Sequence, residues 1–142
     1  MAPKQFYCNT EMIKLFMSLI SVLLSMACSP KEGAEGITSL SAAEFEALLA
    51  RDAAVQLVDV RRAGEYAAGH IGEARLIDVM APDFTERAGK ELDAARPVAV
   101  YCRSGKRSLR AAQMLKEAGF KVIYNLADGY LGWEKYQAGK GR

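Results

Sequence analysis

The stretch VAVYCRSGKRSLRAAQML, residues 98–115, decides the fold. Its first four residues are apolar or aromatic, and they predict a buried strand that runs into Cys102. An amphipathic helical pattern follows over residues 108–120, with Leu109 on its expected apolar stripe and Gly119 as a typical C-cap. A strand that passes through a short polar turn into a helix is the repeating unit of α/β folds.

The same alternation of strand and helix continues along the chain from Ile37. The predicted strands are residues 54–60, 74–80, 98–102 and 121–126, and the predicted helices are residues 43–50, 61–69, the start of 82–97, 108–118 and 129–139. Ser41 and Glu44 form a capping box before the first helix. The alternation predicts a parallel sheet with helices on both faces, where ligands bind beyond the carboxyl ends of the strands. Cys102 lies at one such end.

The segment after this strand, CRSGKR at residues 102–107, is called the cysteine loop below. Gly105 permits the sharp turn that the loop needs. Such a turn directs successive backbone N–H groups inward, and the start of the following helix adds partial positive charge. Arg103, Lys106 and Arg107 add three cations. We therefore predict a thiol whose pKa lies well below its usual value, since this surrounding favours the thiolate.

Three motifs, in order and at proper spacing, carry a resemblance to a known family. They are YCRSGKRS at residues 101–108, DVRRAGEYAAGHIGEA at residues 59–74 and LADGYLGW at residues 126–133. Together they resemble the active-site loop, the DVR segment and the closing segment of single-domain rhodanese-like sulfurtransferases. Asp128 replaces a glycine of the family pattern. The resemblance covers residues 37–139 and implies a rhodanese-like α/β domain over that range.

The resemblance implies sulfur transfer through a cysteine persulfide. Cys102 would be the nucleophile, with a small anionic donor such as thiosulfate and a thiophilic acceptor such as cyanide or a thiol as partners. The substrate-binding residues it implies are Arg103, Ser104, Gly105, Lys106 and Arg107, with Arg107 turned inward and Arg103 and Lys106 meeting the donor. Asp59 and Arg61 would support the cysteine loop from beside it. Neither a metal nor an organic cofactor is expected.

Two other functions fit parts of the pattern. A cysteine phosphatase or arsenate reductase has a similar loop but needs five residues between the cysteine and the arginine, whereas four lie between Cys102 and Arg107. A non-catalytic rhodanese-like module could carry sulfur or bind a protein, although such modules often lose the cysteine that this chain keeps. His70, the one histidine, is expected to be structural because a thiolate needs no base.

The first 36 residues are expected to be separate from this domain. Residues 15–27 follow Lys14 without a charge, and this run is shorter than the roughly 20 residues that span a bilayer. A basic residue, a short apolar core and a small residue predict a secretory signal at residues 1–27, with Met12 as an alternative start. The polar stretch that follows predicts a linker at residues 28–36. LLSMAC resembles the lipobox of bacterial lipoproteins, which implies lipidation at Cys28 and a membrane-anchored periplasmic protein.

Composition limits the remaining possibilities. The chain has 142 residues, which predicts a single domain, most simply a monomer. Its 19 basic and 17 acidic residues are too evenly balanced for a nucleic-acid-binding protein. Of the three cysteines, Cys8 would leave with the signal and Cys28 would carry lipid. Cys102 would remain unpaired in an exported protein, which is typical of a reactive thiol or an intermolecular bridge.

Overall fold

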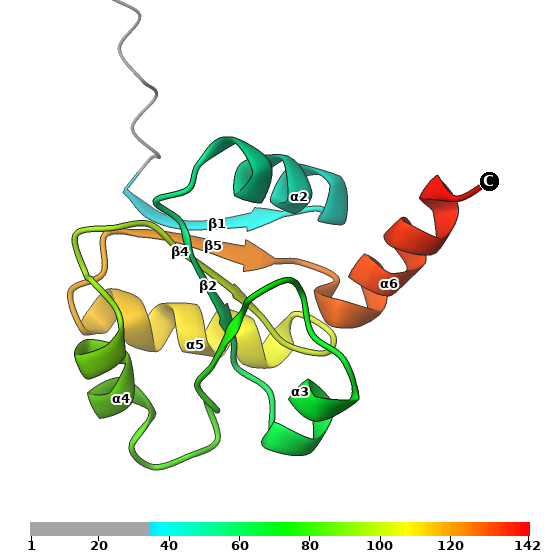
Figure 1. Ribbon diagram of the computed structural model, residues 1–142. Coiled ribbons are helices and arrows are strands. Elements are labelled where there is room, and N and C mark those ends of the chain that lie inside the picture. The colour runs from blue at the N-terminus through cyan, green and yellow to red at the C-terminus, as the bar shows by residue number, and fades with distance from the viewer. Residues whose placement is uncertain (1–34) are drawn as a thin grey trace, which may run out of the picture. The chain divides into compact units, whose positions relative to one another are not determined.

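The structure is a computed structural model that describes residues 35–142. Its five strands are β1 (Gly36–Leu40), β2 (Gln56–Asp59), β3 (Arg75–Leu76), β4 (Val98–Tyr101) and β5 (Val122–Leu126). They form one sheet in the order β1-β5-β4-β2-β3, and every pairing is parallel. The predicted parallel sheet is therefore confirmed, and the strand that leads to Cys102 is its central one (Figure 1).

Helices cover both faces of this sheet, as predicted. They are α2 (Ala42–Arg51), α3 (Ala63–Ala68), α4 (Phe84–Glu91), α5 (Lys106–Glu117) and α6 (Gly129–Lys140). Buried side chains of α4 and α5 form one core cluster with the sheet, and α2 and α6 contribute to a second cluster. Figure 1 shows α2 and α5 on opposite sides of the strands.

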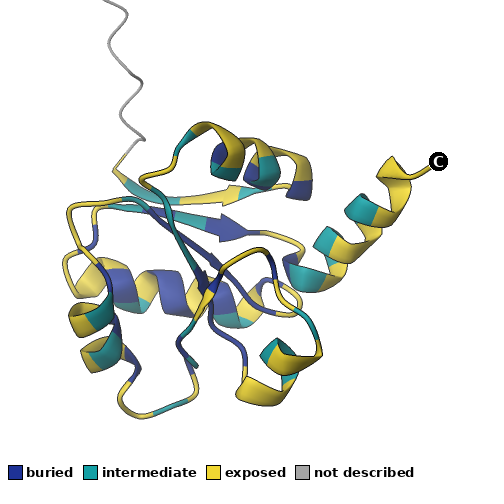
Figure 2. Cartoon of the chain, viewed as in Figure 1, coloured by how far each residue is buried: buried dark blue, intermediate teal, exposed yellow. Residues whose placement is uncertain are grey.

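The central strand β4 is fully buried, because helices pack on both of its faces. Its four residues, Val98, Ala99, Val100 and Tyr101, all have no exposed surface (Figure 2). Side chains alternate between the two faces of a strand. Ala99 and Tyr101 belong to the α2 and α6 cluster, while Val98 and Val100 belong to the α4 and α5 cluster. Cys102 continues the second series, so its side chain lies on the face that α5 covers.

The structure differs from the sequence predictions at several elements. The predicted strand at residues 74–80 is reduced to two residues, since only Arg75 and Leu76 pair with β2, and the Asp78 carboxylate then accepts a turn hydrogen bond from the Met80 N–H at 2.8 Å. Helix α5 begins at Lys106, two residues earlier than predicted. Leu109, expected on its apolar stripe, is 41% exposed. The buried residues of α5 are Ser108, Ala111, Ala112 and Leu115, of which Ala112 and Leu115 lie on the predicted stripe.

The boundaries of the domain shift slightly. β1 begins at Gly36, one residue before the predicted start, and α6 ends at Lys140, one residue after the predicted end. The predicted signal segment, the alternative start at Met12 and the lipidation site Cys28 lie outside the described residues and stay predictions. From residue 35 to residue 142, the structure holds no helix of the length and apolarity that crossing a membrane requires.

Candidate functional site

The cysteine loop lies at the carboxyl end of the central strand, where a parallel sheet binds its ligands. Gly105 has a φ of 91°, a left-handed value that glycine adopts without strain. This conformation turns its N–H toward Cys102 Sγ at 3.1 Å. The Ser108 hydroxyl, in the first turn of α5, lies 3.4 Å from the same sulfur and 3.1 Å from the Gly105 carbonyl oxygen, and it can donate to either. The predicted inward turn at Gly105 is thus confirmed.

These donors change the ionisation of the thiol. Burial acts to raise the pKa of Cys102, but hydrogen bonds from the Ser108 hydroxyl and from the backbone N–H groups of Ser108, Ser104 and Gly105 outweigh it. The net effect lowers the pKa of Cys102 below that of an ordinary thiol, as predicted. The sequence led us to expect both backbone N–H groups and cationic side chains to lower this pKa. In the structure, hydrogen-bond donors rather than cationic side chains are the main influences that favour the thiolate.

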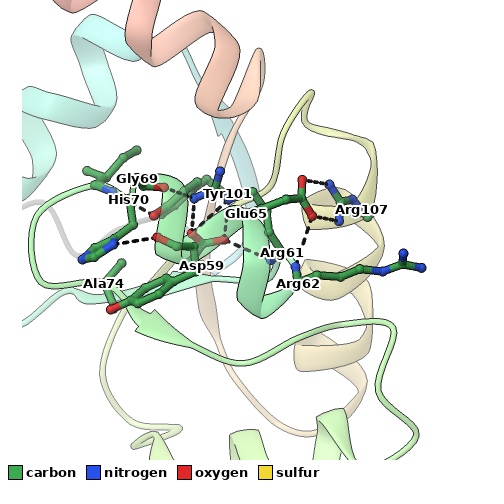
Figure 3. A network of polar contacts seen from close by, with 11 residues as sticks. Asp59, Arg61, Arg62, Glu65, Gly69, His70, Ala74, Tyr101 and Arg107 are labelled. Atoms are coloured by element: carbon green, nitrogen blue, oxygen red, sulfur yellow. Dashed lines mark hydrogen bonds and ion pairs between the residues drawn. The ribbon is translucent and has the colours of Figure 1, made fainter.

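The three cations of the loop lie in different surroundings. Arg103 and Lys106 are exposed, and Arg107 is half-buried. The Arg107 guanidinium donates to both carboxylate oxygens of Glu65, at 2.8 and 2.9 Å. Glu65 also accepts the backbone N–H of Arg62 at 3.2 Å, as Figure 3 shows. Arg107 therefore pairs with a carboxylate of α3 that no local sequence pattern indicates, and its orientation toward the sulfur stays a prediction.

The sulfur of Cys102 is less accessible than a reactive thiol requires. The residue has no exposed surface, although its Sγ has polar partners on the loop side. The sulfur therefore has no surface open to a substrate such as thiosulfate in this arrangement. Any chemistry at Cys102 therefore requires side chains or backbone of the cysteine loop to move aside.

The start of α6 holds the first part of the loop. The Tyr130 N–H donates to the Cys102 carbonyl oxygen at 2.7 Å, and the Leu131 N–H donates to the Arg103 carbonyl oxygen at 3.1 Å. Gly129 permits this approach, since a Cβ at that position would lie 2.4 Å from the Arg103 carbonyl oxygen. The segment LADGYLGW thus contacts the cysteine loop through its backbone.

Asp59 and Arg61 form a buried ion pair beside the loop. The Arg61 guanidinium donates to Asp59 Oδ2 at 2.6 Å and to the Gly69 carbonyl oxygen at 2.6 Å (Figure 3). It also lies 5.5 Å from the ring centre of Tyr101 and 4.3 Å from that of Tyr130. Tyr101 precedes Cys102 in the chain, and the Tyr130 N–H donates to the Cys102 carbonyl oxygen. Because Arg61 contacts both rings, the ion pair supports the two residues that adjoin the Cys102 backbone. A supporting role for Asp59 and Arg61 remains the prediction that fits this geometry.

Two other predicted features bear on the chemistry. His70 is exposed, and its Nδ1 lies 3.0 Å from the Tyr66 carbonyl oxygen, while its ring stacks on that of Tyr66. No contact with the cysteine loop is recorded for it among residues 35–142. The same residues contain no cluster of three histidine, cysteine or acidic side chains suited to a metal ion.

A comparison with known protein families identifies the family to which this arrangement belongs. Residues 41–136 match the Rhodanese-like domain family, and this range holds all three motifs. The chain belongs to the rhodanese family. A solved rhodanese-like domain from an Anabaena protein superimposes with a TM-score of 0.63 at 26% sequence identity, covering 69% of this chain and 74% of that one.

Relatives of this rhodanese-like chain have more than one function. It is 31% identical to thiosulfate sulfurtransferase 18 of Arabidopsis thaliana, over 78% of this chain and 88% of the plant protein. It is also 33% identical to the tRNA uridine(34) hydroxylase of Chlamydia trachomatis, over 78% of this chain but only 35% of that protein. The chain thus spans about a third of the chlamydial relative. Membership of the sulfurtransferase family does not by itself define the reaction.

Two side chains of this rhodanese-like site were not predicted from the sequence. Ser108 was not expected to take part in the site, yet its buried hydroxyl contacts Cys102 Sγ. Its place directly after the loop, in the first turn of α5, is a signal that could have identified it. Glu65 lies 42 residues from Arg107 in sequence, and no local pattern indicates that the two side chains pair.

Ser108→Ala is expected to raise the pKa of Cys102, because the variant loses a hydrogen bond that favours the thiolate. A hydrogen bond to a charged group contributes roughly 1.5–3 kcal/mol, and the 3.4 Å contact is long, so we expect the low end of that range. The measurement is the pH dependence of iodoacetamide labelling, followed on the peptide that contains Cys102. Ser104→Ala is the control, because Ser104 contributes through its backbone N–H, which alanine retains. An unchanged pKa in Ser108→Ala would contradict the assigned role.

Proposed function

We propose that this domain is a sulfurtransferase that moves sulfane sulfur from an anionic donor to a thiophilic acceptor, with Cys102 as the nucleophile. The observation that carries the proposal is the convergence of the Gly105 N–H and the Ser108 hydroxyl on Cys102 Sγ. Donors at this position stabilise a negatively charged sulfur. The similarity to a plant thiosulfate sulfurtransferase supports thiosulfate as the class of donor.

The proposed reaction has two displacement steps at sulfur. The Cys102 thiolate attacks the outer sulfur of thiosulfate, a new S–S bond forms, and sulfite leaves with the electron pair of the broken S–S bond. The product is a cysteine persulfide anion. A thiolate or cyanide acceptor then attacks the terminal sulfur of the persulfide and regenerates the Cys102 thiolate. The covalent intermediate thus divides the transfer into two easier reactions. Neither step changes the total charge, and neither needs a metal or an organic cofactor.

The roles of the other residues follow from their positions. Hydrogen bonds from Ser104, Gly105 and Ser108 hold the negative charge on sulfur in both the thiolate and the persulfide. Arg103 and Lys106 add positive potential around the loop, whereas the charge of Arg107 is compensated by Glu65. Asp59 and Arg61 act as positioning residues, since they fix the backbone on either side of Cys102 without contacting the sulfur.

Intact-mass spectrometry of the full chain after incubation with thiosulfate tests this function. We expect a gain of one sulfur atom, localised to the peptide that contains Cys102, and its loss when cyanide is added. Thiocyanate should appear in the same amount. A chain that binds no sulfur under these conditions, although its Cys102 reacts with iodoacetamide, would show that the domain does not accept sulfur from thiosulfate.

The complete burial of Cys102 favours a second candidate, a non-catalytic module that carries sulfur or binds a protein. A sulfur that is exposed only on contact with a partner suits a carrier better than an enzyme with a small diffusing substrate. Iodoacetamide labelling near pH 6 distinguishes the two functions. Fast labelling of Cys102 supports the enzyme, since it requires both a low thiol pKa and frequent opening of the loop. Slow labelling supports the module.

We further propose that the domain is exported and anchored through lipid on Cys28, on the basis of the sequence of residues 12–28. Two or more acyl chains hold a protein firmly on a membrane. Cells that express the full chain should contain it in the membrane fraction, and Cys28→Ala should move it to a soluble fraction. An equal distribution of both proteins between the fractions would contradict lipidation.

A further inference from the structure

Two surface hollows lie on either side of Glu65, and both reach residues of the cysteine loop or its helix. The first, the Arg62 hollow, has a volume of about 310 Å³ and is lined by Arg62, Glu65, Met80 and Arg107. The second, the Arg103 hollow, has a volume of about 230 Å³ and is lined by Arg61, Glu65, Ala68, Gly69, Arg103, Tyr130, Leu131 and Glu134. Because each hollow includes a residue of the cysteine loop, both are candidate approaches to Cys102 for an anionic sulfur donor.

The charges of the two hollows differ. In the Arg103 hollow, Arg61 is neutralised by Asp59 and Glu65 by Arg107. The remaining charges, those of Arg103 and Glu134, cancel, so this surface is close to neutral. In the Arg62 hollow, Arg107 is neutralised by Glu65, which leaves the charge of Arg62 uncompensated within the hollow. An anion is therefore favoured on the Arg62 side.

The Arg62 side chain is placed to act on incoming anions. Arg62 is exposed, and its guanidinium has no hydrogen bond or ion pair within residues 35–142, while its backbone N–H is fixed to Glu65. Figure 3 shows this side chain extending away from the Asp59–Arg61 pair, on the side where Arg107 meets Glu65. Met80, which is 50% exposed, gives the hollow an apolar wall.

The Arg62 hollow is electrostatically connected to the sulfur. The pKa of Arg107 is raised mainly by its hydrogen bond to Glu65, and also by the negative charges of Cys102 and Asp78. Arg107 therefore lies close enough to Cys102 to respond to its charge. A donor in the Arg62 hollow would meet the Arg107 side of the cysteine loop, five residues along the chain from the nucleophile.

We propose that Arg62 draws the anionic sulfur donor to Cys102 and that the Arg62 hollow is the donor's entry site. This inference rests on the proposed sulfur transfer and identifies the side from which the donor arrives. It differs from the expectation from the sequence, in which Arg103 and Lys106 would meet the donor. Arg103 lies in the hollow that is less favourable to anions, and Lys106 lines neither hollow.

The test compares two reagents that alkylate Cys102 and differ in charge, iodoacetate and iodoacetamide, in the full chain at low salt. Arg62→Gln should lower the rate with iodoacetate about threefold and leave the rate with iodoacetamide unchanged, since an exposed charge contributes a modest attraction. The effect should disappear at high salt. In thiosulfate turnover, the same variant should raise KM by a similar factor and leave kcat unchanged.

Arg110→Gln is the matched control, because Arg110 is also exposed, follows Arg107 in α5 and lines neither hollow. It changes the net charge equally and should leave the rate with iodoacetate unchanged. Equal effects of the two variants would overturn the proposal, since net charge alone would explain them. It is also overturned if neither reagent labels wild-type Cys102, or if KM for thiosulfate is unchanged in Arg62→Gln. If the labelling result holds but wild-type protein accepts no sulfur from thiosulfate, the proposed donor fails while Arg62 still directs anions to Cys102.

Discussion

Cys102→Ser is expected to abolish sulfur transfer. The variant should gain no sulfur from thiosulfate, and thiocyanate formation should fall by at least about a thousandfold, because a nucleophile that forms the covalent intermediate has no substitute. Among residues 35–142, Cys102 is the one cysteine, so no neighbouring thiol in the described domain can replace it. A serine hydroxyl is not ionised at neutral pH, and it would form an ester-like S–O bond that thiosulfate does not favour.

The fold should survive this change. A serine oxygen can accept the Gly105 N–H that now points to Sγ at 3.1 Å, and the change removes little volume from the buried cluster. We expect the free energy of unfolding to change by no more than about 1 kcal/mol, as measured by urea denaturation. Residual activity near that of the wild-type chain, in a folded variant, would show that the transferred sulfur is carried elsewhere.

Local sequence patterns predicted most of the fold. The capping box at Ser41 and Glu44 is present, with the Glu44 carboxylate accepting the Ser41 N–H at 2.9 Å, and α2 begins at the next residue. Capping depends on residues three apart in sequence, so the pattern contains the whole interaction. β3 was overestimated because its length depends on pairing with β2, which no local pattern encodes. Leu109 was wrongly expected on the buried face of α5 for the same reason, since tertiary packing determines which residues at the edge of the stripe are covered.

The same distinction applies to the candidate site. The turn at Gly105 and its contact with Cys102 lie within four residues, and the sequence was sufficient to predict them. The partner of Arg107 comes from α3, and the donor to the Cys102 carbonyl oxygen comes from α6. Such long-range contacts depend on the packed sheet. Sequence alone therefore indicated a cationic ring around the sulfur, whereas the structure shows one of its three cations already paired.

Gly105→Ala is expected to damage both the fold and the site. The left-handed φ of 91° strains an alanine, and its Cβ would lie 1.9 Å from the backbone carbonyl oxygen of Ala127. Strain of this kind contributes up to about 3 kcal/mol. The atoms that the new Cβ would meet are backbone atoms, which cannot turn away as a flexible side chain can. We expect the free energy of unfolding to fall by about 3 kcal/mol. Because the Gly105 N–H would move away from Sγ, the pKa of Cys102 should also rise and sulfur transfer should decrease at least about tenfold.

Gly89→Ala is the matched control for this prediction. Gly89 lies in α4, and a Cβ built there has no heavy atom within 4 Å and no unusual φ. Since glycine in a helix interior is less favourable than alanine by roughly 0.5–1 kcal/mol, this variant should be slightly more stable than the wild type. Urea denaturation and the pH profile of Cys102 labelling measure both variants. A Gly105→Ala protein with wild-type stability and thiol pKa would show that the loop can form without the left-handed turn, and the backbone cradle for the sulfur would lose its structural basis.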